Sequence, residues 1–148
     1  MMKGIMPTTW LLIAIAAEIA LHLVLPVMVV IPPLWNLLGI IPLVAGVAIN
    51  LISDKAFRKA NTTVRPFQES SALITDGAFR ISRNPMYLGF VLILVGIAVL
   101  LGSLTPFLVI PAFATLLDRV YVAAEEQMLA DRFGTEWEEF QRRRRRWL

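Results

Sequence analysis

Two adjacent carboxylates, Glu125 and Glu126, follow a long apolar run and are the first candidates for chemistry in this chain. If the run is a helix, they lie toward its C-terminal end, where the helix dipole disfavours negative charge. Asp118 and Arg132 lie at matching intervals before and after Glu125, so these three side chains would share one helix stripe. Such a stripe suits a cationic ligand, namely an ammonium or a sulfonium, or the hydroxyls of a ribose. The simpler alternative is a solvated helix end.

A second candidate is the short stretch around Asn84 and Pro85. Asn is a favoured N-cap and Pro is well tolerated at the first helical position, so this pair predicts a helix start. The free backbone N–H groups and the dipole of such a start attract a carboxylate or a phosphate. Arg83 and Tyr87 flank it. The alternative is a well-capped helix whose Arg side chain lies at headgroup level.

A third candidate is the pair of Glu18 and His22, which are four residues apart in the first apolar run. Residues at this spacing share a helix face. Ionisable groups inside a membrane span usually have a function, so this pair could line an acceptor pocket or act as a general base. A structural pair, satisfied mutually or packed on Asn50, is the alternative.

The C-terminal segment combines aromatic and basic residues. Phe133, Trp137 and Phe140 recur at helical spacing, and five consecutive arginines, residues 142–146, follow them. This pattern predicts an amphipathic helix at the membrane surface, with the arginines on anionic lipid headgroups. Nucleic-acid binding is not expected, because no nucleic-acid-binding fold surrounds the segment.

The elements that must position these groups are apolar runs. Hydrophobic residues make up 57% of the chain, well above the roughly 45–50% of soluble domains, so the excess points to a bilayer. A membrane helix needs about 20 apolar residues. The sequence predicts an all-α integral membrane protein, a single domain over residues 1–148. Its predicted parts are spans at about 8–31, 34–52, 85–101 and 104–122, a loop at 53–84, and a tail at 123–148 with a cytoplasmic amphipathic helix.

Charge sets the predicted orientation. An even number of spans puts both termini on one side, together with Lys3, the basic loop and the Arg-rich tail, whereas the turns at 32–33 and 102–103 carry no charge. The positive-inside rule makes the basic side cytoplasmic, in the cell inner membrane. The short turn at 102–103 also brings the ends of the third and fourth spans together, so Tyr87 and Glu125 are expected to face one cleft.

Composition narrows the chemistry further. The chain has no cysteine and a single histidine, which excludes disulfides, thiolate-bound clusters and a histidine-rich metal site. A metal site built from carboxylates alone is not expected either. The oligomeric state is left open by the sequence.

Several of these stretches occur in a familiar order. They are residues 75–80 (Thr-Asp-Gly-Ala-Phe-Arg), residues 83–89 (Arg-Asn-Pro-Met-Tyr-Leu-Gly), an apolar hairpin, Glu125-Glu126, and Phe133-Gly134 with an aromatic tail. Over about residues 61–148 this order resembles the isoprenylcysteine carboxyl methyltransferase and phospholipid methyltransferase superfamily, in its bacterial form. The superfamily usually has His where this chain has Asn84, so no imidazole acts at that position.

The resemblance implies an integral membrane methyltransferase that uses S-adenosyl-L-methionine on a lipid or lipidated acceptor, such as a phospholipid or an isoprenylcysteine. It implies that Arg132 meets a carboxylate of the substrate or cofactor, and it leaves Glu18 and His22 as further catalytic candidates. The cofactor-binding residues that it implies are Asn84, Tyr87, Leu88, Gly89, Glu125 and Glu126.

Two other functions fit parts of the pattern. One is a non-catalytic membrane scaffold that binds anionic lipid through its Arg tail. The other is a membrane oxidoreductase of the sterol-reductase type with a nicotinamide cofactor, although the chain has no additional basic phosphate-binding motif for it.

Overall fold

The computed structural model describes residues 5–148, and this part of the chain is helical apart from turns, loops and one isolated β-bridge between Val29 and Ser103. The all-α prediction is therefore confirmed for the described residues. In chain order the elements are α1 (Pro7–Val24), η2 (Trp35–Gly39), α2 (Ile40–Lys59), η3 (Gly77–Arg80), α3 (Pro85–Leu101), η4 (Thr105–Leu108), α4 (Val109–Leu117), η5 (Asp118–Val122), α5 (Ala123–Phe133) and α6 (Thr135–Arg143).

Among residues 5–148, three helical segments are long and apolar enough to cross a membrane: Pro7–Val24, Trp35–Lys59 and Thr105–Phe133. Helix α3, Pro85–Leu101, is also apolar but is shorter than these three. Large apolar side chains cover the outside of the bundle, for example Leu12, Val44 and Leu108. Such a surface is expected where lipid, not water, surrounds a protein.

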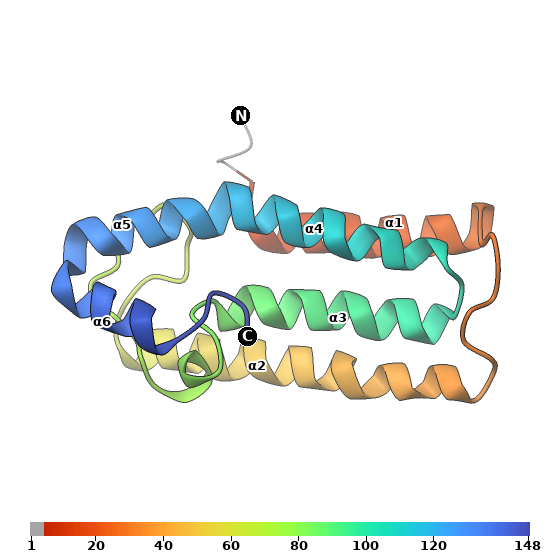
Figure 1. The fold of residues 1–148 in the computed structure, drawn as a ribbon, viewed down its shortest axis with the longest axis horizontal. Helices are drawn as coiled ribbons and strands as arrows, with labels where there is room; N and C mark the ends of the chain where they lie inside the picture. Colours follow the sequence, from red (N-terminus) through yellow and green to blue (C-terminus); the bar gives the residue numbers. More distant parts are fainter. Residues whose placement is uncertain (1–4) are drawn as a thin grey trace.

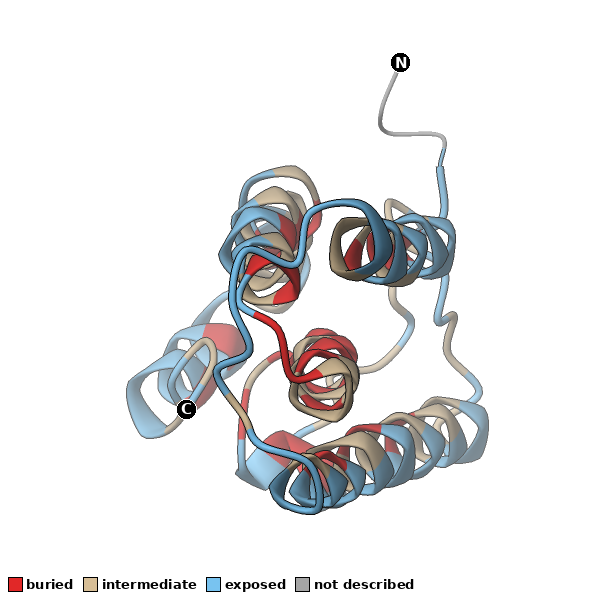
Figure 2. Ribbon diagram, turned by 90° about the vertical axis from the view of Figure 1, so that its right-hand side faces the viewer, coloured by how far each residue is buried: buried red, intermediate tan, exposed pale blue. Residues whose placement is uncertain are grey.

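The long helices run side by side, with α3 in the middle of the bundle (Figure 1). Helix α3 packs on α2 on one side and on α1 and α4 on the other. Viewed along the bundle, buried positions face inward and exposed positions face outward (Figure 2). Helix α3 thus holds its N-terminal end, with Asn84 and Tyr87, in a fixed place among the other helices.

Glycine allows α2 and α3 to approach closely. A Cβ atom added to Gly46 would lie 2.5 Å from the carbonyl oxygen of Gly89, and one added to Gly39 would lie 2.4 Å from the carbonyl oxygen of Gly96. Both distances are too short for any side chain. Small residues at helix contacts in membranes allow this kind of backbone approach.

Helix α1 ends at Val24, earlier than the predicted span end at Ile31. Pro26 explains the difference, because a proline disfavours helical dihedrals in the residue before it, and Leu25 is already outside the helical region. The chain then crosses the end of the α3–α4 hairpin. The N–H groups of Val30 and Ile31 donate to the carbonyl oxygen of Gly102.

Helices α4 and α5 form one continuous rod that contains a π-turn, η5, at Asp118–Val122. A π-turn shifts the register of the side chains that follow it. As a result Asp118 aligns with Glu126, since one arginine, Arg146, contacts both carboxylates. The predicted stripe that joined Asp118 to Glu125 is therefore not formed.

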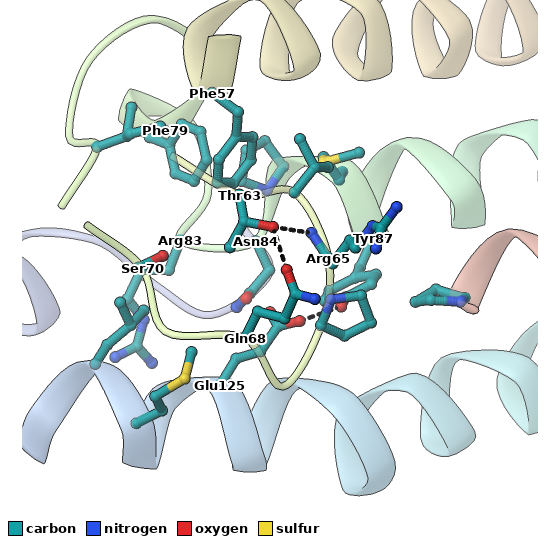
Figure 3. A pocket seen from close by; sticks show the side chains of 18 of the residues that line it. Phe57, Thr63, Arg65, Gln68, Ser70, Phe79, Arg83, Asn84, Tyr87 and Glu125 are labelled. Carbon is teal, nitrogen blue, oxygen red and sulfur yellow. Dashed lines mark hydrogen bonds between the residues drawn. The ribbon is translucent and has the colours of Figure 1, made fainter. Parts of the chain in front are cut away.

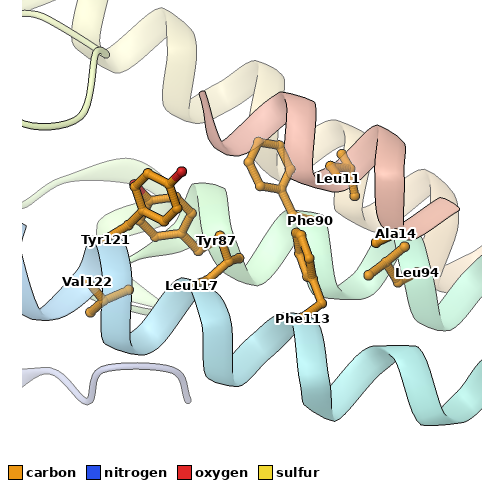
Figure 4. Packing of buried hydrophobic residues seen from close by; sticks show 9 residues of the cluster. All are labelled: Leu11, Ala14, Tyr87, Phe90, Leu94, Phe113, Leu117, Tyr121 and Val122. Atoms are coloured by element: carbon orange, nitrogen blue, oxygen red, sulfur yellow. The ribbon is translucent and has the colours of Figure 1, made fainter. Parts of the chain in front are cut away.

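The main apolar core lies between the long helices, close to the start of α3 (Figure 4). Tyr121 and Leu117 are fully buried in it. The Tyr121 hydroxyl donates to the carbonyl oxygen of Ile5 at 2.6 Å, which ties the N-terminal end of α1 to η5. The core residues are Leu11, Ala14, Tyr87, Phe90, Leu94, Phe113, Leu117, Tyr121 and Val122.

Helix α6 differs from the prediction in what its aromatic face contacts. Trp137 and Phe140 are buried, and together with Phe79 they form a second apolar cluster that also includes Phe57 of α2. The aromatic face predicted to lie on the membrane is instead packed within the protein. Burial of large aromatic side chains is a strong driving force for docking, so α6 closes one end of the bundle.

Candidate active site

A pocket lies at the end of the bundle where α3 begins, beside the first turns of α5. The loop at residues 63–74 and the N-terminal end of α1 complete its wall. Most of the wall is apolar, and the polar side chains that interrupt it include Arg65, Gln68, Asn84, Tyr87 and Glu125 (Figure 3).

Tyr87 and Glu125 meet in this pocket. The Tyr87 hydroxyl donates a hydrogen bond of 2.5 Å to Oε1 of Glu125. One residue comes from the first turn of α3 and the other from the first turn of α5, so the α3–α4 hairpin brings them together. The prediction that these side chains face one cleft is confirmed. Charge-assisted bonds of this kind are among the strongest neutral-to-ion contacts in proteins.

Glu126 points elsewhere, although it is next to Glu125 in the sequence. Its Oε1 lies 3.3 Å from Nη2 of Arg83, and its Oε2 lies 2.5 Å from Nη2 of Arg146. Glu126 is buried and is not among the residues that line the pocket. Adjacent residues on a helix point about 100° apart, so one carboxylate faces the pocket and the other faces two guanidinium groups.

Arg83 lines the pocket and is almost wholly enclosed. Its side chain is 9% exposed, and its guanidinium lies 5.7 Å from the centre of the Trp137 ring. Within residues 5–148, its Nε and Nη1 have no hydrogen-bond partner. Burial lowers the pKa of Arg83, while the charge of Glu126 opposes that shift and the nearby Arg146 adds to it.

The end of the chain crosses the start of α3, and we call residues 145–147 the C-terminal strap. The N–H of Arg83 donates to the carbonyl oxygen of Arg145 at 3.0 Å, and the Ser82 hydroxyl donates to that of Arg146 at 2.9 Å. The Arg146 guanidinium donates to Asp118 and Glu126, and Trp147 Nε1 donates to Asp118. The hydrogen bond with Glu126 is the largest of the effects that raise the pKa of Arg146.

Sequence reasoning placed Arg146 with the surface arginines and missed this strap. One feature of the sequence could have predicted it. Acidic residues gather near the end of a long apolar helix, and two carboxylates there need cationic partners. Arg142 and Arg143, in contrast, are exposed and pair only along their own helix, with Glu138 and Glu139. The arginine run thus divides: the partly buried Arg146 pairs with Asp118 and Glu126, whereas Arg142 and Arg143 pair at the surface.

Asn84 occupies the predicted N-cap position of α3, but its side chain does not cap the helix. Its Nδ2 donates instead to the carbonyl oxygen of Arg146 at 3.2 Å, and its backbone N–H donates to the Ser82 hydroxyl. Asn84 is buried and lines the pocket. Its amide therefore links the strap to the pocket wall.

Leu88 and Gly89 are buried in α3 but do not line the pocket. Gly89 faces α2, where an added Cβ would lie 2.2 Å from Nδ2 of Asn50. Its small size therefore has a clear packing reason. Of the stretch Asn84 to Gly89, the structure brings Asn84 and Tyr87 together with Glu125.

The other candidates lie away from this pocket. Arg132 Nη1 contacts Oε2 of Glu69 at 3.0 Å on the surface. Glu18 is fully buried in the bundle, and neither carboxylate oxygen has a hydrogen-bond partner among the described residues. His22 Nδ1 lies 2.7 Å from the hydroxyl of Ser103, at the opposite end of the molecule. Glu18 and His22 are therefore not the mutually bonded pair that was one of the alternatives.

Within residues 5–148, no group of three or more His, Asp or Glu residues could hold a metal ion. The polar groups of the pocket are carboxylate, hydroxyl, amide and guanidinium. Such a set binds an organic ligand with charged and hydroxyl groups.

No curated protein and no solved structure shows significant similarity to the chain. The family model described as phospholipid methyltransferase matches residues 34–136. This segment contains α2, α3, α4 and α5, with Tyr87 and Glu125. Because the match covers well over half of the sequence, the chain belongs to the phospholipid methyltransferase family.

Proposed function

We propose that this protein transfers a methyl group from S-adenosyl-L-methionine to a lipid or lipid-like acceptor at the cytoplasmic face of a membrane. Family membership supports methyl transfer to a lipid. The candidate spans support a place in the membrane. The observation that carries the proposal is the Tyr87–Glu125 pair inside a pocket at one end of these spans.

The residues of the pocket fit this cofactor. It carries an ammonium, a sulfonium, a carboxylate and ribose hydroxyls. Glu125 is a carboxylate on the pocket wall, which suits the ammonium or the hydroxyls. Asn84 and the first turn of α3 suit the carboxylate, because backbone N–H groups and the positive end of the dipole meet there. In this scheme Glu126 acts indirectly, by holding Arg83 and Arg146 in place.

For methyl transfer, the protein mainly has to align the donor with the acceptor and exclude water. When bound, the cofactor supplies an electrophilic methyl group. The aromatic side chains of Phe57, Phe79 and Phe90 line the pocket and exclude water from it. An acceptor carboxylate needs no base, whereas an acceptor ammonium must first lose a proton. Glu125 is placed to take that proton, while Glu18 and His22 lie farther away.

The decisive test is incubation of the purified protein with methyl-labelled cofactor and total membrane lipid, followed by mass spectrometry of the products. We expect a labelled lipid that requires the protein. Calorimetry with the cofactor alone gives a second reading. Absence of both labelled product and saturable cofactor binding would favour the lipid-binding scaffold, and saturable binding of a nicotinamide cofactor would favour the reductase.

A further inference from the structure

One cation on the pocket wall has no acidic partner. Among residues 5–148, the pocket-lining side chains that carry positive charge are Arg83 and Arg65. Arg83 is paired with Glu126, whereas Arg65 is exposed and makes no ion pair within residues 5–148. Several other basic side chains near this end of the bundle are paired: Arg58 with Asp54, Arg80 with Asp76, Arg132 with Glu69, and Arg146 with Asp118 and Glu126. Lys55, Lys59, Arg144 and Arg145 make no ion pair within residues 5–148, but they do not line the pocket. Arg65 is therefore the pocket cation that is available to an anionic ligand.

The loop that carries Arg65 is held in place by its own hydrogen bonds. The Arg65 N–H donates to the Thr63 hydroxyl oxygen, and that hydroxyl donates to Oε1 of Gln68, both at 3.0 Å. On the other side of the loop, the Phe67 ring lies 5.5 Å from the ring of Tyr121. Contacts on both sides keep the backbone at Arg65 over the pocket. Less conformational entropy is then lost when its side chain binds a ligand.

Arg65 also lies beside the start of a candidate membrane span. Met6, Pro7 and Thr8 line the same pocket, and the candidate span α1 begins at Pro7. The loop and the start of α1 meet at Tyr121, which contacts Phe67 by its ring and Ile5 by its hydroxyl. A span begins where hydrocarbon gives way to headgroups. We therefore expect an arginine beside this end of the span to lie near the phosphates of the lipid leaflet.

We propose that Arg65 binds the phosphate of the lipid acceptor and so makes the site select phospholipids over lipids that lack phosphate. This inference rests on the proposed function, since it assumes that the acceptor enters this pocket. The guanidinium fork matches phosphate oxygens in two-point contacts, which a single ammonium cannot reproduce. Glu125 also lines this pocket. In this scheme the reacting end of the acceptor lies at Glu125, while its phosphate lies at Arg65.

The test compares Arg65→Gln with the full-length parent in a phosphate-free detergent. The probes are a short-chain phosphatidylethanolamine and a diacylglycerol with the same chains. We expect the parent to bind the phospholipid more tightly than the diacylglycerol. Arg65→Gln should lose this preference, with phospholipid affinity reduced by about tenfold. Arg65→Lys should recover part of it, since it keeps the charge without the fork.

The matched control is Arg58→Gln, because Arg58 is exposed, pairs with Asp54 and does not line the pocket. This variant should behave like the parent. Cofactor affinity, measured in the same samples, should change less than twofold in Arg65→Gln. Both variants change exposed side chains, so their unfolding temperatures should match that of the parent.

Two results would overturn the inference. If Arg65→Gln keeps the preference for phospholipid, another group binds the phosphate. If it instead weakens cofactor binding, Arg65 holds the cofactor carboxylate. Failure of the proposed function would look different, because the parent would then bind no cofactor and methylate no lipid. The affinities of parent and Arg65→Gln for the two lipids could still be measured and compared in that case.

Discussion

At the scale of single residues, two neighbouring carboxylates have different surroundings. Glu125 contacts Tyr87 in the pocket, and Glu126 contacts Arg83 and Arg146 beside it. Both are close to the start of α3, where they hold two sides of the same site. We infer that Glu125 binds the ligand directly and that Glu126 keeps the basic groups in position.

Glu125→Gln should weaken the binding of S-adenosyl-L-methionine by roughly tenfold or more, since a hydrogen bond to a charged group contributes about 1.5–3 kcal/mol. The substitution removes the charge and keeps the shape. Calorimetric titration in detergent measures the effect. Glu138→Gln is the control, because Glu138 is exposed on α6 and pairs only with Arg142. If Glu125→Gln bound the cofactor like the parent, Glu125 would not contact it.

Arg146→Gln should lower the free energy of unfolding by about 1–3 kcal/mol, the cost of losing hydrogen bonds to charged partners. Glu126 would remain buried with Arg83 as its remaining partner. Arg142→Gln should change stability by less than about 0.5 kcal/mol, as expected for an exposed pair within one helix. Thermal unfolding of the two variants compares them directly. Equal stability would mean that the C-terminal strap contributes little to the fold.

At the scale of elements, the packing of α2 against α3 determines where the pocket lies. Gly46 faces Gly89 and Gly39 faces Gly96, so the two helices are in contact along most of their length. Asn84 and Tyr87 are at the N-terminal end of α3, and any displacement of this helix moves them. The glycine contacts are therefore part of the support of the site.

Gly46→Ala should destabilise the protein by about 1–3 kcal/mol, the usual cost of overpacking. The new Cβ would lie 2.5 Å from the carbonyl oxygen of Gly89, so the helices must separate. Ala48→Val, on the exposed face of α2, is the control and should have little effect. Thermal unfolding in detergent gives the comparison. An unchanged midpoint for Gly46→Ala would show that α2 and α3 separate at little cost.

The elements that were predictable from sequence are those with local signals at both ends. Helix α3 spans Pro85–Leu101 as expected, since Asn84-Pro85 starts it and Gly102, with a positive φ of 76°, ends it. Its hairpin with α4 then made the meeting of Tyr87 and Glu125 predictable. The early end of α1 was also encoded, at Pro26, but an otherwise apolar sequence concealed it.

The parts of the site that were not predictable depend on contacts between distant segments. The C-terminal strap meets Arg83 through a hydrogen bond from residue 83 to residue 145, and no local pattern indicates such a pairing. The π-turn at Asp118–Val122 is similar, because its register shift selects Glu126 as the residue that shares Arg146 with Asp118. Both features depend on contacts that exist only in the folded protein, so the sequence alone does not predict them.

At the scale of the whole molecule, charge is concentrated at the pocket end. The loop 53–84 and the tail after α5 are rich in Arg and Lys, whereas residues 25–39 and 101–117 contain no charged side chain. The first segment crosses the α3–α4 turn at the opposite end of the bundle (Figure 1). Lys3, which was part of the topology prediction, lies outside the described residues.

This asymmetry predicts that the pocket end and the C-terminus are cytoplasmic, since positively charged loops stay on the cytoplasmic side. The chain has no cysteine, so one introduced cysteine is the sole thiol of each variant and reports on its own position. In intact cells, Thr75→Cys and Leu148→Cys should be protected from a membrane-impermeant thiol reagent, and Leu34→Cys should react. All three positions are exposed in the structure, which makes membrane protection the only barrier to labelling. After the cells are opened, the first two should react as well. Labelling of Thr75→Cys from outside would place the pocket on the other face of the membrane, away from a cytoplasmic supply of cofactor.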